Sequence, residues 1–147
     1  MTDLNELYQE VILDHNRQPC NFHRLEGPHR SAEGFNPVCG DRMTVYLRLE
    51  EGRIAEVSFL GSGCAISKAS ASMMTTCLKG KSQAESEALF EKFHCMVTGG
   101  KVDLAGLGKL AAFSGVSEFP MRVKCASLPW HTLRAALEAR KEAVTTE

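Results

Sequence analysis

The strongest constraint on the fold is a pair of strand-like runs in the middle of the chain, joined by a short turn. Residues 43–49 and 54–60 flank the turn Glu51-Gly52-Arg53, and the first run places apolar side chains at every second position: Met43, Val45, Leu47 and Leu49. This two-residue period on either side of so short a turn predicts a β-hairpin. Phe35 and Asn36, just before it, can add a short third strand.

Helical segments surround the hairpin. Apolar residues recur at helical spacing before it, and again after it, which predicts helices at 3–15, 65–78, 83–97, 104–112 and 126–143. Residues 17–34 contain prolines and glycines among charges and are predicted to be a loop. This order of elements predicts an α+β fold, a small antiparallel sheet with helices packed on one face. With 147 residues and no internal repeat, we expect a single domain spanning residues 1–147.

The charge balance argues against several classes of partner. Lys plus Arg number 17 and Asp plus Glu number 18, so the formal net charge is −1. This gives no support for binding to nucleic acid or to an anionic membrane surface. No apolar run approaches the length of a membrane span, and the first residues lack the basic start and apolar core of a signal peptide. We therefore expect a cytoplasmic protein.

Six cysteines, at positions 20, 39, 64, 77, 95 and 125, are the chemically unusual feature of the chain. In a small secreted protein an even number would indicate disulfides, but structural disulfides are rare in the cytosol. We therefore expect these cysteines to be ligands, nucleophiles or core residues.

Three of the cysteines lie at junctions between predicted elements. Cys39 is separated from Asp41 only by a glycine, so the backbone can bend to direct both side chains to one point. Cys64 follows Gly61-Ser62-Gly63 at the start of a predicted helix, where unpaired N–H groups favour a thiolate; alone, it suits a buried cysteine at a glycine-rich turn equally well. Cys125 lies near the start of the last predicted helix, beside two cations.

These junctions can converge at one end of the sheet, where three thiolates and a carboxylate would complete a tetrahedral site for zinc or an iron–sulfur species. The other three cysteines do not fit such a site. Cys95 pairs with His94 on a helix, but adjacent helical side chains diverge by about 100°, and we place both on a solvated face. Cys77 is predicted to be a core residue and Cys20 a bystander thiol in a loop.

Four motifs carry a resemblance to a known family. They are, in order, Asn36-Pro37-Val38-Cys39-Gly40-Asp41, Gly61-Ser62-Gly63-Cys64-Ala65-Ile66-Ser67, Ala69-Ser70-Ala71-Ser72-Met73-Met74-Thr75 and Arg122-Val123-Lys124-Cys125-Ala126. With them the chain resembles the U-type iron–sulfur cluster assembly proteins, IscU and SufU, over nearly its whole length. It is more similar to the SufU subgroup, because Lys124 stands where IscU-type proteins carry a histidine and because residues 80–100 look like the extra helical segment of that subgroup.

The resemblance implies a SufE/IscU-like fold and a zinc site formed by Cys39, Asp41, Cys64 and Cys125. It also implies that Cys39 accepts persulfide sulfur from a pyridoxal-phosphate-dependent cysteine desulfurase of the SufS type, leaving the zinc as a partner histidine takes its place. Arg122 is implied to steer or stabilise the sulfur anion. Such a protein is a sulfurtransferase acting with a partner rather than a stand-alone turnover enzyme, and it passes sulfur to a downstream scaffold or to apo-proteins.

Two alternatives remain open on the sequence. The same ligands can hold iron or a 2Fe-2S cluster, which would make the protein a scaffold for cluster assembly. A zinc-stabilised interaction module without transfer chemistry is the other. Lys124 in place of histidine favours the sulfur acceptor over the scaffold, and the basic pair beside Cys125 disfavours a purely structural module.

Overall fold

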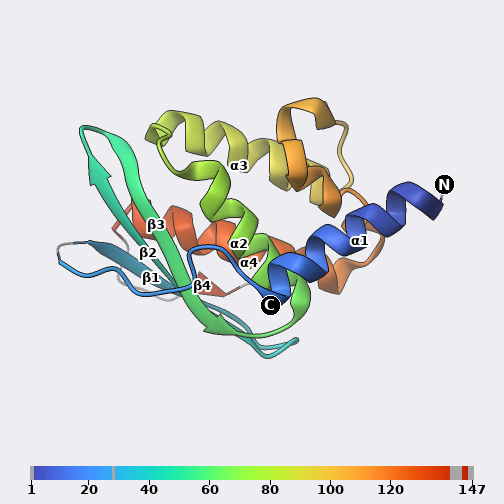
Figure 1. Ribbon diagram of the computed structural model, residues 1–147, viewed down its shortest axis with the longest axis horizontal. Helices are drawn as coiled ribbons and strands as arrows, with labels where there is room; N and C mark the ends of the chain where they lie inside the picture. The colour runs from blue at the N-terminus through green and yellow to red at the C-terminus, as the bar shows by residue number, and fades with distance from the viewer. Residues whose placement is uncertain (1, 28, 140–143, 146–147) are drawn as a thin grey trace.

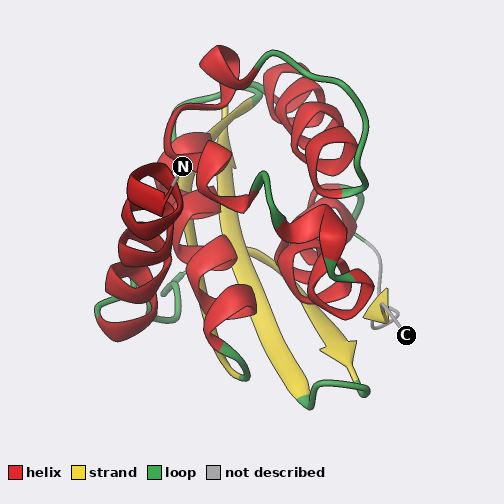
Figure 2. Cartoon of the chain, turned by 90° about the vertical axis from the view of Figure 1, so that its right-hand side faces the viewer, coloured by secondary structure: helices red, strands yellow, loops and turns green. Residues whose placement is uncertain are grey.

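The chain folds as a four-stranded sheet with helices layered on one face (Figures 1 and 2). The structure is a computed structural model and describes residues 2–27, 29–139 and 144–145. The strand order is β3-β2-β1-β4, and the first three strands are antiparallel: β1 (Arg30–Asn36), β2 (Asp41–Glu50) and β3 (Arg53–Ser62). The predicted hairpin is therefore confirmed as β2 and β3.

The first strand is longer than the sequence predicts. Residues 30–34 belong to β1, although we expected them to lie in a loop. Its inward-facing positions are Ala32, Gly34 and Asn36, which are small or polar and so hide the alternation of a buried face. A fourth strand that the sequence did not reveal, β4 (Val144–Thr145), pairs in parallel with β1.

Two central helices cover the inner face of the sheet. The helix α2 (Ala65–Leu78) lies on β3 and the helix α4 (Pro120–Leu137) lies on β1 and β2 (Figure 1). Ser70 joins them, because its hydroxyl donates to the Ala126 carbonyl at 2.7 Å and accepts from the Trp130 indole at 3.1 Å. Trp130 is fully buried, so the two helices are fixed against one another in the core.

The remaining helices form an outer layer. The first, α1 (Thr2–Arg17), packs on α2, while α3 (Gln83–Val97) packs on α4 and the short 3₁₀ segments η1 (Leu104–Phe113) and η2 (Val116–Glu118) (Figure 1). The first three predicted helices are confirmed. The fourth is a 3₁₀ segment interrupted at Gly108, whose φ of 57° and ψ of −131° cannot continue a helix. No helix in the described ranges is long and apolar enough to cross a membrane.

The last helix begins earlier than predicted. It starts at Pro120, six residues before the expected start at 126, and its regular part ends at Leu137; residues 140–143 of the prediction lie outside the described residues. A proline is favourable at the first position of a helix, because its missing N–H would have no partner there. Cys125 consequently lies in the second turn of α4, well inside the helix rather than near its start.

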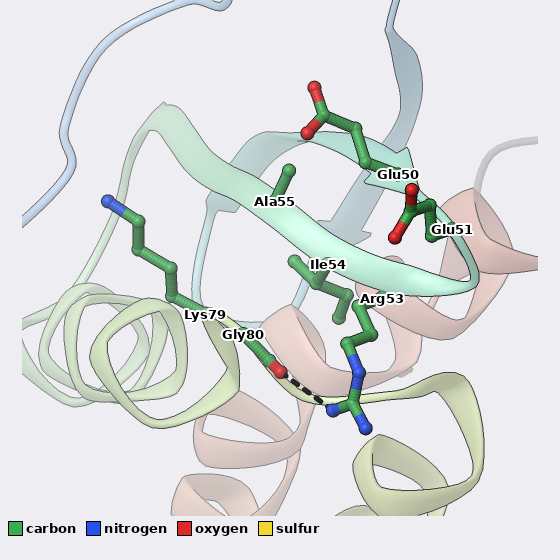
Figure 3. A pocket seen from close by; sticks show the side chains of 7 residues that line it. All are labelled: Glu50, Glu51, Arg53, Ile54, Ala55, Lys79 and Gly80. Atoms are coloured by element: carbon green, nitrogen blue, oxygen red, sulfur yellow. Dashed lines mark hydrogen bonds between the residues drawn. The ribbon is translucent and has the colours of Figure 1, made fainter.

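At a shallow hollow beside the hairpin turn, hydrogen bonds connect the hairpin to the segment between α2 and α3. Ile54 exchanges backbone hydrogen bonds with the α2–α3 connection, donating to the Lys81 carbonyl at 2.8 Å and accepting from Gly80 at 2.7 Å. Arg53 donates to the Gly80 carbonyl at 3.1 Å (Figure 3) and pairs with Glu85 at 3.3 Å. Arg53, one of the two cations that line this hollow, therefore holds the hairpin against the helices, and no thiol or imidazole lines the hollow.

Candidate metal centre

The turn between β1 and β2 presents the first two candidate ligands. Gly40 adopts a φ of 74°, a left-handed conformation that allows the tight turn between Cys39 and Asp41. Asp41 is the first residue of β2, lies directly opposite Asn36 in the strand register, and is only 2% exposed. Cys39 is half-buried on the turn itself. The sheet therefore fixes the carboxylate, while the thiol stands on a surface loop.

Cys64 caps the start of α2 and is tied to Asp41. Its backbone N–H donates to Asp41 Oδ1 at 2.8 Å, and its thiol lies 3.7 Å from Asp41 Oδ2. The Ser67 N–H donates to Cys64 Sγ at 3.5 Å, so the thiol takes the place of a capping hydroxyl. A Cβ at Gly63 would overlap the Asp41 carboxylate, which explains why this turn carries a glycine.

Cys125 reaches the same place from α4. Its Sγ lies 3.1 Å from Cys39 Sγ, although the two residues are far apart in sequence. The helix can approach β1 this closely because the strand has no side chain at Gly34, where a Cβ would overlap Thr132. Cys125 is only 2% exposed and is therefore the most buried of the three thiols.

Asn36 is a buried neighbour of the site whose role the sequence did not reveal. Its amide Nδ2 donates to Cys125 Sγ at 3.5 Å, and the residue is fully buried. Its Oδ1 has no hydrogen-bond partner among the described residues. The signal available in the sequence is its place in the Asn36-Pro37-Val38-Cys39-Gly40-Asp41 motif, three residues before Cys39.

The thiols do not hold their protons equally. The hydrogen bond from Cys125 and those from Ser67 together outweigh the opposing effect of burial and lower the pKa of Cys64 to about 6. The same bond to Cys64, together with burial, raises the pKa of Cys125. At neutral pH Cys64 is therefore the thiolate of this pair, and Cys125 keeps its proton.

The donor set fits a metal ion by its chemistry and spacing. Ligand atoms of Cys39, Asp41 and Cys125 all lie within 4.8 Å of one another, and Cys64 adjoins this set through its contacts with Asp41 and Cys125. Three sulfurs and a carboxylate oxygen suit a tetrahedral zinc or an iron–sulfur species. No other group of three such residues occurs in the described part of the chain.

Arg122 does not touch the site. It lies exposed in the first turn of α4, with its guanidinium 5.5 Å from the centre of the Phe119 ring, and forms no ion pair within the described ranges. Lys124, which is half-buried, likewise has no ion-pair partner among these residues. The basic pair therefore flanks the thiols without neutralising a particular ligand atom.

The cysteines set aside on the sequence lie outside this cluster. Cys95 donates its thiol to the Lys101 carbonyl at 3.6 Å. Its neighbour His94 is half-buried rather than solvated, because its ring stacks on Phe90 and meets the ring of His131 at 5.8 Å. Cys77 is half-buried against the core, where burial raises the pKa of its thiol.

Comparison with known proteins identifies the family. The NifU-like N-terminal domain matches residues 7–126. This chain belongs to that family. The U-type assembly family expected from the four motifs is thereby confirmed, and with it the α+β fold.

Two relatives of the NifU-like chain cover most of its length. It is 37% identical over 139 residues to the iron–sulfur cluster assembly scaffold protein IscU of Streptococcus pyogenes serotype M1, with 94% of this chain and 87% of the relative covered. It is 39% identical over 132 residues to the zinc-dependent sulfurtransferase SufU of Bacillus subtilis (strain 168), with 89% of each covered. The names of the two relatives thus divide between a scaffold and a sulfurtransferase.

Solved structures share the fold. A scaffold protein for the SUF system from Fervidobacterium islandicum AW-1 superposes with a TM-score of 0.83 at 38% identity, covering 87% of this chain and 94% of that one. The N-terminal part of a NifU-like protein from Brucella abortus superposes with a TM-score of 0.82 at 20% identity, covering 92% and 95%. The second likeness concerns the fold alone.

Proposed function

We propose that this protein is a zinc-bound sulfur acceptor in iron–sulfur cluster assembly. Cys39 takes persulfide sulfur from a pyridoxal-phosphate-dependent cysteine desulfurase of the SufS type and passes it to a downstream scaffold or apo-protein. The observation that carries the proposal is the convergence of Cys39, Cys64 and Cys125 with Asp41, from three separate elements, at one end of the sheet. We place this activity in the cytoplasm and in a single domain spanning residues 1–147.

Cys39 is the best placed of the three thiols to accept sulfur. Cys64 is held by the start of α2 and by Asp41, and Cys125 is buried within α4. Cys39 stands on the β1–β2 turn, half-buried, next to Val38, which is 53% exposed. An acceptor must meet a sulfur carried by another protein, and only a thiol on a surface loop can do so without unfolding a helix.

The other three ligands, Asp41, Cys64 and Cys125, form the part of the site that stays in place when Cys39 moves. When bound, zinc would keep the thiols ionised without redox chemistry of its own. Asp41, Cys64 and Cys125 are anchored by the sheet, by α2 and by α4, so they retain their positions whether or not Cys39 is engaged. Cys39 can therefore move on its turn while the other three donors stay in place.

The surface near Cys39 supports docking of a partner. Phe119 and Met121, at the start of the helix that carries Cys125, are both 54% exposed, as is Val38 to a similar degree. Arg122 adds an exposed cation in the same turn of α4. Exposed apolar side chains on the segments that carry the ligand thiols can form an interface, and we propose that Arg122 steers the anionic persulfide of the desulfurase toward Cys39.

A second candidate function uses the same ligands. The protein would then be a scaffold on which a 2Fe-2S cluster is assembled, and a sulfur-rich tetrahedral donor set suits iron as well as zinc. The IscU relative is named as such a scaffold, while the SufU relative is named as a zinc-dependent sulfurtransferase. IscU-type proteins carry a histidine at the position of Lys124. The lysine in this chain therefore favours the sulfur-acceptor function over the scaffold function.

Desulfurase stimulation tests the proposal. Alanine production by a SufS-type desulfurase should rise on addition of the zinc-loaded protein and should not rise with Cys39→Ser. The matched control is Cys20→Ser, which removes a half-buried loop thiol outside the cluster and should stimulate like the unsubstituted protein. Full stimulation by Cys39→Ser would contradict the acceptor role, and a cluster-type visible absorbance with stoichiometric iron would favour the scaffold.

A further inference from the structure

The contact between Cys39 and Cys125 is closer than metal binding alone requires. Their sulfurs lie 3.1 Å apart, which is only about 1 Å longer than a disulfide bond. The Cys64 sulfur lies 3.5–3.8 Å from its partner atoms on Asp41 and Ser67, and it is also hydrogen-bonded to Cys125. Cys39 and Cys125 can therefore react with one another after a small movement of the turn.

The sulfurs of Cys39 and Cys125 also differ in their exposure to solvent. Cys39 is half-buried on a surface turn, whereas Cys125 lies behind it in the helix layer and is 2% exposed. A sulfur delivered by another protein must attach to Cys39 from the open side. Cys125, 3.1 Å from the Cys39 sulfur, then meets the inner sulfur of the persulfide from the buried side, while the outer sulfur can leave on the open side.

We propose that Cys125 is a resolving thiol that converts the Cys39 persulfide into sulfide and a Cys39–Cys125 disulfide. This inference rests on the proposed function, because it requires a persulfide on Cys39. The proton of Cys125 passes to the departing outer sulfur as the Cys125 sulfur attacks the inner sulfur of Cys39; the new sulfur–sulfur bond forms, and the bond to the outer sulfur breaks. The outer sulfur departs as hydrogen sulfide, with its own proton and that of Cys125. The outer sulfur is reduced, the two cysteines are oxidised, and a dithiol reductant returns the disulfide to two thiols.

Neighbouring residues favour Cys125 over Cys64 for this step. The amide of Asn36, 3.5 Å away, holds the Cys125 sulfur toward Cys39 from a fully buried position. The Cys64 sulfur is turned toward Asp41 and accepts from the N–H of Ser67 at the start of its own helix. When Cys125 is engaged as a metal ligand, its sulfur is not free to attack. Metal occupancy then decides whether the persulfide is kept for transfer or released as sulfide.

The test compares metal-free and zinc-loaded protein, with no thiol present other than the cysteine that the desulfurase consumes in its own arm. Cys39 is loaded with sulfur in two ways, by a desulfurase with cysteine and, in a separate arm, by inorganic polysulfide. Released hydrogen sulfide is quantified, and the acid-quenched protein is digested with trypsin without reduction. The three thiols fall in separate peptides, 31–42, 54–68 and 125–134, each with one cysteine, so the linked pair is identified by mass.

We expect metal-free protein to release one hydrogen sulfide for each link between peptides 31–42 and 125–134, and zinc-loaded protein to keep the persulfide. Because a well-placed internal thiol far exceeds a dissolved one in effective concentration, Cys125→Ser should lose its persulfide about 100-fold more slowly. Cys64→Ser removes the competing thiol and should still form the 39–125 link, and Cys20→Ser, outside the cluster, is the matched control. Circular dichroism checks that these variants fold, and the mapping of the unsubstituted chain needs no variant.

The inference is overturned if hydrogen sulfide leaves metal-free protein without the 39–125 link, if Cys39 links to Cys64 instead, or if Cys125→Ser loses its persulfide at the original rate. Failure of the proposed function gives a different pattern. In that case the desulfurase places no sulfur on Cys39, while the polysulfide arm still produces the persulfide and its resolution by Cys125.

Discussion

The substitution Asp41→Ala should lower both the stability of the fold and the affinity for zinc, and the contacts of Asp41 allow both effects to be predicted. Asp41 Oδ1 accepts the Cys64 N–H at 2.8 Å, at a position only 2% exposed. Removing the carboxylate leaves that buried N–H without a partner and destabilises the fold by about 1–3 kcal/mol. Asp41→Asn keeps an acceptor at the same place and should change the unfolding free energy of the metal-free protein by less than about 1 kcal/mol.

Zinc binding separates the ligand role of Asp41 from this structural role. Structural zinc sites contribute about 10–16 kcal/mol from four ligands, or about 2.5–4 kcal/mol for each one. Loss of one ligand should therefore weaken zinc about 100- to 1,000-fold, and both Asp41→Ala and Asp41→Asn should show it. Chemical denaturation of the metal-free protein and competition with a chelating dye give the two quantities, and Asp14→Asn, at an exposed carboxylate outside the site, is the control. Unchanged zinc affinity in Asp41→Asn would refute the argument.

Three further predictions concern the hydrogen bond from Asn36, the protection of the ligand cysteines by zinc, and the pH dependence of the unfolding free energy. Asn36→Asp removes the amide donor to Cys125 and should weaken zinc about 10- to 100-fold in the same competition, with a changed sulfur-to-metal absorbance when cobalt is substituted; identical spectra would count against it. Zinc should slow alkylation in folded protein, read by peptide mass, only at Cys39, Cys64 and Cys125. Burial lowers the pKa of His131, so the unfolded chain binds more protons and the fold should lose stability as pH falls through 6.5; His131→Gln should flatten that slope in urea unfolding between pH 5 and 7.5.

The elements with a clear period were predictable from the sequence. The hairpin follows from alternation around a two-residue turn, and α2 and α3 begin and end where their caps and periodicity indicate. The sequence failed where tertiary contacts replace periodicity. β1 buries Ala32, Gly34 and Asn36 under α4, and small or polar residues on a buried face leave no alternation to detect.

The candidate site was predictable as a set of residues but not as a set of contacts. The positions of Cys39, Cys64 and Cys125 at element junctions, and the family motifs around them, single out these thiols. The distances from Cys125 to the other ligands depend on how closely α4 approaches β1, and Gly34, which is not itself a ligand, permits that approach. For the same reason the 3.1 Å contact between Cys39 and Cys125, and the amide of Asn36 behind it, emerge only from the folded chain.

The measurement that tests the central claim most directly is mass mapping of the Cys39 peptide, residues 31–42, after incubation of zinc-loaded protein with a SufS-type desulfurase and cysteine. Zinc is quantified in the same sample. We expect one added sulfur on this peptide, none on peptides 54–68 and 125–134, and about one zinc per chain, as the four-ligand site requires. An unmodified Cys39 in protein that carries its zinc, while the desulfurase turns over, would contradict the account.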